Sequence, residues 1–187
     1  MPIAVLKLQE EKNIMPNRVE NIASKAVGKL KSAKAAVEGL TGVFRRLAQE
    51  HGEVTALLMR VKHSSDPGVR TTLFATIKKE LLAHEKSELK AVYPVLLEHA
   101  DTQQIAAHHN QEAAQLEQMI TELAALDTGD ASWPAKFEAL VDTVQHHATE
   151  EEEQIFPQAQ RVLGERAADA LLPDYEKAKA EIASRLN

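Results

Sequence analysis

Apolar residues at helical spacing constrain the fold of this 187-residue chain more than any other feature. Four long blocks show them every three or four residues, which is the period of an α-helix with one buried face. Short segments rich in turn-forming residues separate the blocks, as at 63–68 and 127–130. Because long helices joined by short connections pack as antiparallel neighbours, we predict an all-α, up-down-up-down four-helix bundle. Its helices are expected at about 41–62, 69–98, 102–126 and 132–163.

Two further segments flank the predicted bundle domain, which covers residues 41–163. Residues 1–40 form an irregular leader and then a basic amphipathic helix, where five basic side chains between 18 and 37 stand against one Glu. We expect its apolar face to pack on the bundle, although contact with a membrane surface or an acidic partner is an alternative. Residues 164–187 are expected to be a short helical tail interrupted by Pro173. The apolar positions of the basic helix are Ile22, Ala23, Ala26, Val27, Leu30 and Ala33.

The composition excludes several classes of function. The chain has no Cys, so disulfides, Cys-ligated metal sites and thiolate catalysis are excluded. Its net charge of −6 argues against nucleic acid as a partner. No apolar run is long enough to span a membrane, and the N-terminus lacks the basic start of a signal peptide. We therefore expect a cytoplasmic protein; its oligomeric state is not predicted.

Histidine and glutamate occupy the centres of the apolar stripes. His51 lies on the stripe of the first block, His84 and Glu88 on that of the second, and His147 and Glu151 on that of the fourth. Residues four apart in a helix point to the same side, about one turn apart. Each His-x-x-x-Glu pair thus aims an imidazole and a carboxylate at one volume in the core.

Buried carboxylates at these positions require a cation. Burying a carboxylate costs several kcal/mol unless a positive group meets it. Lys and Arg are missing from the central stripe positions, so we predict that a metal ion supplies the charge.

An internal repeat extends the predicted site to the third block. His84 and His147 are each followed by Glu at +4, an aromatic residue at +9 and Pro at +10. If the two halves are related, the third block supplies the counterpart of His51. His109 is favoured because it has Leu at +7, as His51 does, whereas His108 has Glu112 at +4. Glu112 is expected to be an extra ligand or an acceptor that orients an imidazole.

This ordered set resembles the hemerythrin-like HHE cation-binding family over about residues 41–163. The resemblance implies a non-haem diiron site with oxo and carboxylate bridges between the two Fe ions. By this match His51, His84, His109 and His147 are terminal ligands, and Glu88 and Glu151 are the bridges. Blood-type hemerythrins carry a fifth His in the third helix, where this chain has the pair His108 and Glu112. A carboxylate there favours ferric iron over reversible oxygen carriage.

The ligand types fit other metals and several functions. Mixed His and carboxylate ligation suits iron, manganese or zinc, and iron is preferred from the family resemblance. The Glu-x-x-His motif of ferritin-like proteins is missing. We expect the protein to bind O2, NO or peroxide, either as a binding protein or as a peroxide-decomposing enzyme. The alternative is an iron-binding adaptor or donor without gas chemistry.

Overall fold

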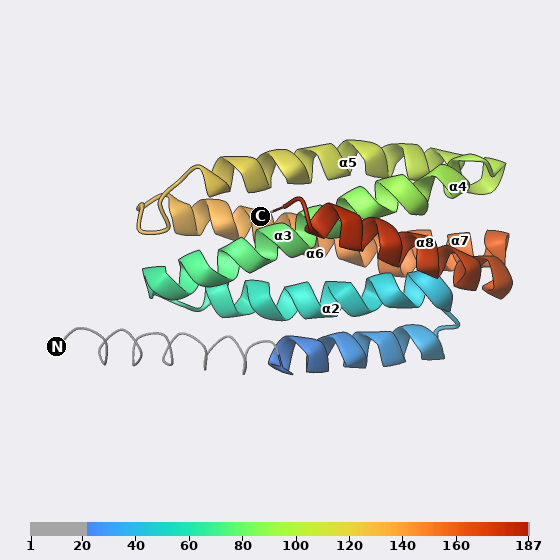
Figure 1. Ribbon diagram of the computed structural model, residues 1–187, viewed down its shortest axis with the longest axis horizontal. Coiled ribbons are helices and arrows are strands. Elements are labelled where there is room, and N and C mark those ends of the chain that lie inside the picture. The colour runs from blue at the N-terminus through green and yellow to red at the C-terminus, as the bar shows by residue number, and fades with distance from the viewer. Residues whose placement is uncertain (1–21, 187) are drawn as a thin grey trace.

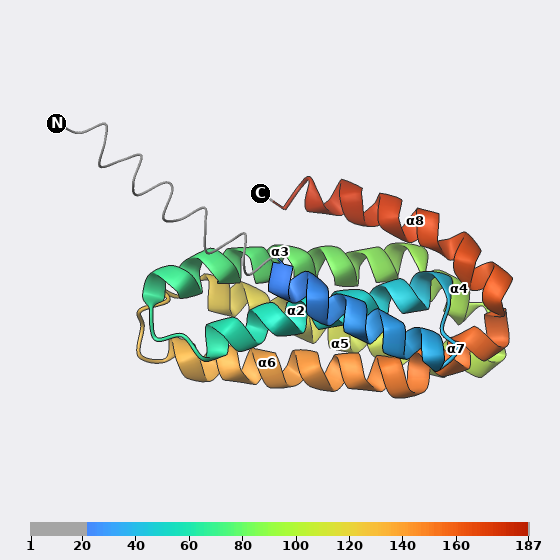
Figure 2. The ribbon, with the colours of Figure 1, turned by 90° about the horizontal axis from the view of Figure 1, so that it is seen from below.

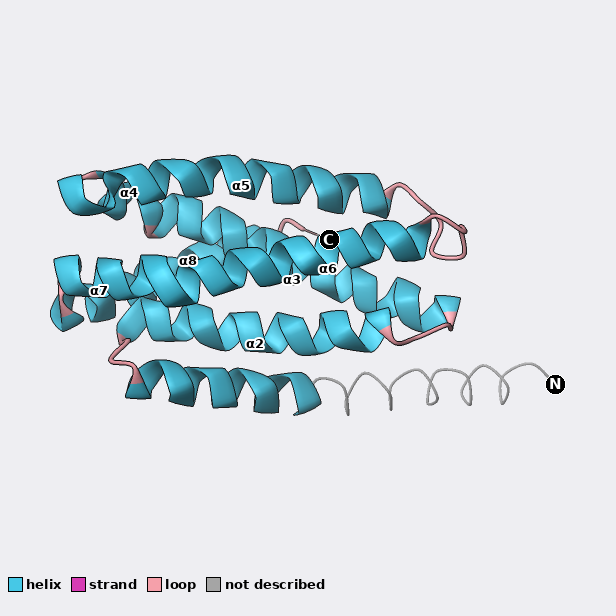
Figure 3. Ribbon diagram, turned by 180° about the vertical axis from the view of Figure 1, so that it is seen from behind, coloured by secondary structure: helices cyan, strands magenta, loops and turns pink. Residues whose placement is uncertain are grey.

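The computed structural model describes residues 22–186, and this part of the chain is helical with no strand (Figures 1 and 3). The all-α prediction is therefore confirmed. The predicted irregular leader, 1–16, and the start of the basic helix lie outside the described residues. No helix within 22–186 combines the length and apolar character needed to cross a membrane. After an N-terminal helix at 22–37, the elements are α2 (Gly42–Lys62), α3 (Pro67–Ala91), α4 (Tyr93–Leu97), α5 (Ala100–Ala124), α6 (Trp133–Glu150), η1 (Glu151–Ile155), α7 (Phe156–Leu163) and α8 (Glu165–Ala183).

Four long helices, α2, α3, α5 and α6, lie side by side, and the chain reverses direction from each to the next (Figures 1 and 2). Contacts run between α2 and α3, α3 and α5, α5 and α6, and α2 and α6. Two apolar clusters hold them together. One surrounds Trp133 and Phe137 near the α2–α3 and α5–α6 turns, and the other surrounds Phe44 and Phe156 at the opposite end. The polar residues of the candidate site lie between these clusters.

Two predicted helices are interrupted just after their Glu. The block predicted at 69–98 divides at Val92 into α3 and α4, and the block predicted at 132–163 contains a π-helical turn at Glu151–Ile155. Each interruption directly precedes a proline, Pro94 or Pro157. Proline lacks an N–H and clashes with the carbonyl four residues earlier, so it favours a break or a bulge in the preceding turn. The interpretation of 69–98 as a single helix was therefore wrong, whereas the block predicted at 132–163 is one helical run, 133–163, that contains a π-helical turn.

The N-terminal helix packs with the face opposite to the one expected. Its buried residues are small, namely Ser24, Gly28, Ser32 and Ala35, while Leu30 is 72% exposed. Small residues let two backbones approach: a Cβ added to Gly52 of α2 would lie 2.9 Å from the Gly28 Cα. The expectation that the apolar residues cover the bundle was therefore wrong.

The C-terminal tail is one helix, α8, that continues through Pro173 and packs along α3 and α2 (Figure 2). The predicted interruption at Pro173 was wrong. Tyr175 and Ala168 of α8 are fully buried. Gly42 begins α2 with φ +47°, and an added Cβ there would meet the backbone of Ala168. This close approach positions α8 against the helix that carries His51.

Candidate metal centre

The two His-x-x-x-Glu pairs meet in the middle of the molecule, from α3 and from the α6–η1 junction. Glu88 and Glu151 are fully buried, and His84 and His147 are each 6% exposed. Within each helix the imidazole Nε2 lies close to the carboxylate four residues on, at 3.6 Å from Glu88 Oε1 and at 3.7 Å from Glu151 Oε2. The structure therefore brings all four side chains to one buried volume.

α2 and α5 each add one imidazole. His51 Nε2 lies 3.1 Å from both His84 Nε2 and Glu151 Oε2. His109 is fully buried, with Nε2 at 3.7 Å from Glu88 Oε2 and Nδ1 at 3.4 Å from Glu151 Oε1. The side chain of His108 is 59% exposed and lies in a separate surface group with Glu112 and Glu150. Of the two candidates on α5, only His109 reaches the buried volume.

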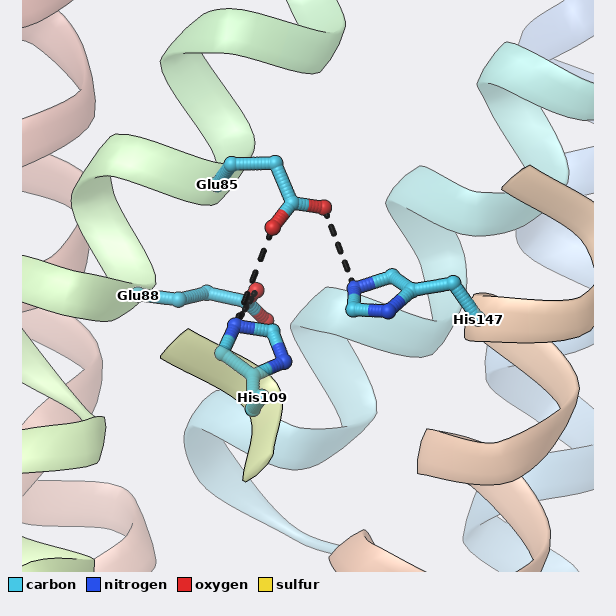
Figure 4. A group of neighbouring side chains, drawn as sticks. All are labelled: Glu85, Glu88, His109 and His147. Atoms are coloured by element: carbon cyan, nitrogen blue, oxygen red, sulfur yellow. Dashed lines mark ion pairs between the residues drawn. The ribbon is translucent and has the colours of Figure 1, made fainter. Parts of the chain in front are cut away.

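The nitrogen and oxygen atoms fall into two adjacent groups, each with its atoms within 4.8 Å of one another. The first group contains Glu85, Glu88, His109 and His147 (Figure 4), and the second contains His51, His84 and Glu151. Glu88 and Glu151 lie between the groups: the oxygens of Glu88 face His84 and His109, and Glu151 Oε2 faces His51 and His147. Each of these two carboxylates therefore lies close to imidazoles of both groups.

Glu85 is a member of the first group that sequence reasoning missed. Its carboxylate lies between two imidazoles, with Oε1 at 3.2 Å from His147 Nε2 and Oε2 at 3.7 Å from His109 Nε2 (Figure 4). The residue is 5% exposed. Nothing in the repeat points to it, because the equivalent position after His147 is Ala148.

Most of these side chains carry buried atoms without a hydrogen-bond partner. A buried polar atom left unpaired costs about 1–3 kcal/mol, and a charged one costs more. Several such atoms in one volume indicate that a cation belongs among them. The unpaired atoms of the site are Glu85 Oε2, both oxygens of Glu88, both ring nitrogens of His109, His147 Nε2 and Glu151 Oε2.

The electrostatics of the site also indicate a missing positive charge. Burial raises the pKa of Glu88 well above its usual value, and the carboxylates of Glu151 and Glu85 raise it further. Burial would raise the pKa of Glu151 too, but the neighbouring imidazoles, above all His147, outweigh burial and lower it. For His147, burial opposes the charged form, yet Glu151 and Glu85 raise its pKa to about 10. Protons here partly supply the charge that a metal ion would bring.

Three of the imidazoles have Nδ1 hydrogen-bonded to a carboxylate that lies outside the two buried groups. His51 Nδ1 lies 2.9 Å from Glu152 Oε1, and His84 Nδ1 lies 2.9 Å from Glu50 Oε2. His147 Nδ1 lies 3.3 Å from Glu112 Oε2. A carboxylate on one ring nitrogen fixes the tautomer and directs the other nitrogen to a metal. Glu112 therefore lies where an orienting acceptor would, outside the two buried groups.

α8 supports the carboxylate that holds His84. The Tyr175 hydroxyl and the Lys179 ammonium each donate to Glu50 Oε2 at 2.6 Å, and Arg46 donates to Glu50 Oε1 at 2.8 Å. Burial opposes ionisation of Glu50, but His84 and Lys179 together lower its pKa. Sequence reasoning did not predict this support, because an amphipathic tail helix does not reveal what its buried face contacts.

The aromatic residues at +9 of each repeat stack on imidazoles of the site. Tyr93 lies parallel to His109, with ring centroids 3.6 Å apart, and its hydroxyl donates to Glu151 Oε1 at 2.7 Å. Phe156 stacks on His51 at 5.8 Å. The internal repeat of the sequence therefore extends to these contacts. Tyr93 of the first half stacks on His109 of the second, and Phe156 of the second half stacks on His51 of the first.

A cavity of about 580 Å³ reaches the site from the surface beside α2. It ends on His51, His84, Glu85 and His147. Its walls include Val54, Leu57, Leu73, Leu81 and Val144, and its rim includes Lys25, Arg46, Glu53, Glu80 and Lys179. A cavity of this size admits a small molecule to the buried groups.

Comparisons with known proteins agree with this geometry. A protein named DNA nickase, from Nostoc sp. (strain PCC 7120 / SAG 25.82 / UTEX 2576), is 23% identical over 143 residues. The match covers 75% of this chain but only 40% of that protein. No solved structure matches the chain. The model of the hemerythrin HHE cation-binding domain matches residues 42–159, which include every residue of the two buried groups. The chain belongs to the hemerythrin HHE cation-binding domain family.

Proposed function

We propose that this protein holds two iron ions in the two buried groups and uses them to bind O2, NO or peroxide. The observation that carries the proposal is the cluster of unpaired buried nitrogen and oxygen atoms on α3, α5, α6 and η1. The HHE family match supports metal binding. We further propose that α2, α3, α5 and α6 form the up-down-up-down bundle of this family and that the protein is cytoplasmic.

The two proposed metal positions differ in their donors. Glu85, Glu88, His109 and His147 would hold one ion, and His51, His84 and Glu151 would hold the other. Glu88 and Glu151 can each offer an oxygen to both positions. The first position has four protein donors and the second has three. We therefore place the external ligand at the second position, which has fewer protein donors; its His51 and His84 line the cavity, as do Glu85 and His147 of the first position.

Iron, when bound, supplies a site at which electrons pass to or from a small oxygen or nitrogen species. The protein's contribution is to hold and shield it. Glu50 and Glu152 keep the Nε2 atoms of His84 and His51 facing inward. The Tyr93 hydroxyl donates a hydrogen bond to Glu151 Oε1, so one oxygen of that carboxylate is already engaged. The aliphatic cavity walls limit the access of water.

The second candidate function is an iron-binding adaptor or donor without gas chemistry. The cavity favours small-molecule binding over this alternative, because a protein that only stores a metal needs no passage of this size. We do not extend the nicking of DNA to this chain. The match covers only 40% of that relative, so what that protein does is not carried over to this chain.

The optical spectrum of the iron-loaded protein tests the proposal, recorded oxidised and then reduced, each with azide and with NO. A bridged diferric centre is expected to give near-ultraviolet charge-transfer bands that azide perturbs, and the reduced centre is expected to bind NO. Bands that neither azide nor NO changes would support the adaptor function. Zinc binding with no affinity for iron would contradict the proposal.

A further inference from the structure

The N-terminal helix presents an apolar stripe to the outside of the molecule. Ile22, Ala26, Leu30, Ala33 and Val37 follow one another at spacings of four, four, three and four residues, so they share one face. All five are exposed, with Ile22 at 65%, Leu30 at 72% and Val37 at 89%. Within residues 22–186, the exposed large hydrophobic side chains are these three and Val27. An exposed stripe of this kind on one helix marks a contact surface.

Lysine is the only charged residue type between 22 and 37, at four positions. Lys29 and Lys34 lie along the two edges of the stripe, by the angular spacing of an α-helix of about 100° per residue. Lys29 is exposed. Lys34 is 65% exposed and pairs only loosely with Glu38, at 3.6 Å. The chain as a whole carries −6, residues 22–37 carry +4, and the remaining residues therefore carry −10.

The opposite face of the helix anchors it to the bundle. Arg45 donates to the Ser32 hydroxyl at 3.0 Å, and Lys31 pairs with Glu152 at 2.6 Å. Gly28 lies directly against the backbone of α2 at Gly52. The helix is the outermost element beside α2, and the view from below places it in front of the other helices (Figures 1 and 2). The stripe is therefore held in place and forms a projecting ridge.

We propose that this helix docks the protein on an anionic lipid surface. An apolar ridge with lysines along both edges matches the way an amphipathic helix lies in the headgroup region, with its apolar side down and its ammonium groups at the phosphates. The charge difference between residues 22–37, at +4, and the remaining residues, at −10, orients the molecule with this helix toward an anionic surface. The surface position also leaves the metal-binding residues untouched.

Two other occupants fit the ridge less well. A second copy of the chain would place the lysines at both edges of one stripe against those of the other, with no acidic residue between 22 and 37 to pair with them. A rigid protein would need a groove shaped to the ridge, whereas the headgroup region deforms around it. Lipid is therefore the occupant that both the charge and the shape favour.

Vesicle flotation of the full-length, iron-loaded protein tests the proposal. Wild type is expected to float with vesicles of phosphatidylcholine and phosphatidylglycerol, to float much less with phosphatidylcholine alone, and to dissociate as salt is added. Replacing Ile22, Leu30 and Val37 together with Ser removes the apolar contact and should lower vesicle affinity more than about a hundredfold. Lys29→Gln should lower it about fivefold.

The controls separate docking from folding and from metal binding. Leu30→Met keeps the apolar area and should float as wild type does. Iron content and the melting temperature should be unchanged in all variants, because the replaced side chains face outward. Failure of the wild type to float with anionic vesicles, or equal flotation of the triple Ser variant, would overturn the proposal. So would a dimer in size-exclusion chromatography that the triple Ser variant abolishes without any flotation.

Discussion

The two halves of the bundle place the same kinds of residue in the same positions but surround them differently. Each half has a lone imidazole on its first helix, a His-x-x-x-Glu on its second, and an aromatic residue and a proline further on. The shared positions converge on one buried volume. The differences are local: Glu85 against Ala148, and Tyr93 against Phe156. The repeat thus brings two groups of possible metal ligands together, and the differences make the two groups unequal.

The support behind the two halves differs as well. His84 is held by Glu50, which α8 reaches through Tyr175 and Lys179. His147 is held by Glu112, whose side chain is 21% exposed. One imidazole is therefore braced by a buried network and the other by a carboxylate near solvent. We expect variants of shared positions to have the largest effects and variants of the unequal positions to have smaller and separable ones.

The largest effect is expected from removing an imidazole that both halves share. His84→Ala and His147→Ala should each lower iron affinity by more than about a hundredfold, because each removes a proposed ligand itself rather than its outer partner. The melting temperature of the iron-loaded protein should fall with the loss of bound metal. Iron content by elemental analysis after anaerobic loading measures the first effect. His108→Ala and His146→Ala are the controls, because their side chains are 59% and 76% exposed. Loss of iron in these variants would contradict the assignment of the ligands to the buried imidazoles.

Glu85→Gln tests the carboxylate found in the first half alone. The substitution keeps the shape but removes the charge, so the ion among Glu85, Glu88, His109 and His147 should bind about tenfold to a hundredfold more weakly. Anaerobic iron titration should then show one tight and one weak equivalent. Glu117→Gln, at an exposed position, is the control. Equal weakening of both equivalents would mean that Glu85 does not distinguish the positions.

The bracing by α8 is tested by Tyr175→Phe combined with Lys179→Met. Losing both donors leaves Glu50 with Arg46 and His84 as partners, so His84 should be held less firmly. We expect iron affinity to fall about tenfold. Glu112→Gln, in the other half, should have a smaller effect because Glu112 is closer to solvent. If Glu112→Gln lowered iron affinity more than the α8 variant does, the carboxylate of Glu112 would be the more important support.

Tyr93→Phe gives the first half the residue type that Phe156 supplies at the equivalent position of the second half, and it should have the smallest effect. It removes the hydrogen bond to Glu151 Oε1 but keeps the stack on His109. The free energy of unfolding should fall by about 1–3 kcal/mol, as for a buried hydrogen bond to a carboxylate. Chemical denaturation of the metal-loaded protein measures it. Tyr93→Ala also removes the stack and should cost more; equal costs would mean that the stack contributes nothing.

Much of the site could be predicted because its residues interrupt an apolar stripe. His51, His84, Glu88, His147 and Glu151 stand at core positions of helices, so their convergence follows from periodicity alone. His109 required the internal repeat to separate it from His108. Glu85 lies one residue after His84 and off the stripe, so periodicity assigns it to another face. Only the packing of α5 against α3 and the approach of His147 from α6 place it inside the site.

The flanking segments were harder to predict, for a physical reason. Hydropathy assumes that the larger apolar residues face the core. The N-terminal helix instead buries Ser24, Gly28 and Ser32, because small residues allow close backbone contact with α2. The role of α8 depends on Tyr175 and Lys179 meeting Glu50 more than a hundred residues away in sequence. Ser24, Gly28 and Ser32 do recur every four residues, but a pattern of small residues does not register as hydropathy, and the α8 contacts leave no periodic signal.

Anomalous X-ray diffraction at the iron absorption edge, from crystals of the iron-loaded protein, locates the bound iron. We expect two anomalous peaks, one among Glu85, Glu88, His109 and His147 and the other among His51, His84 and Glu151, with Glu88 and Glu151 between them. A single peak, or iron bound at the surface group of His108, Glu112 and Glu150, would contradict this expectation.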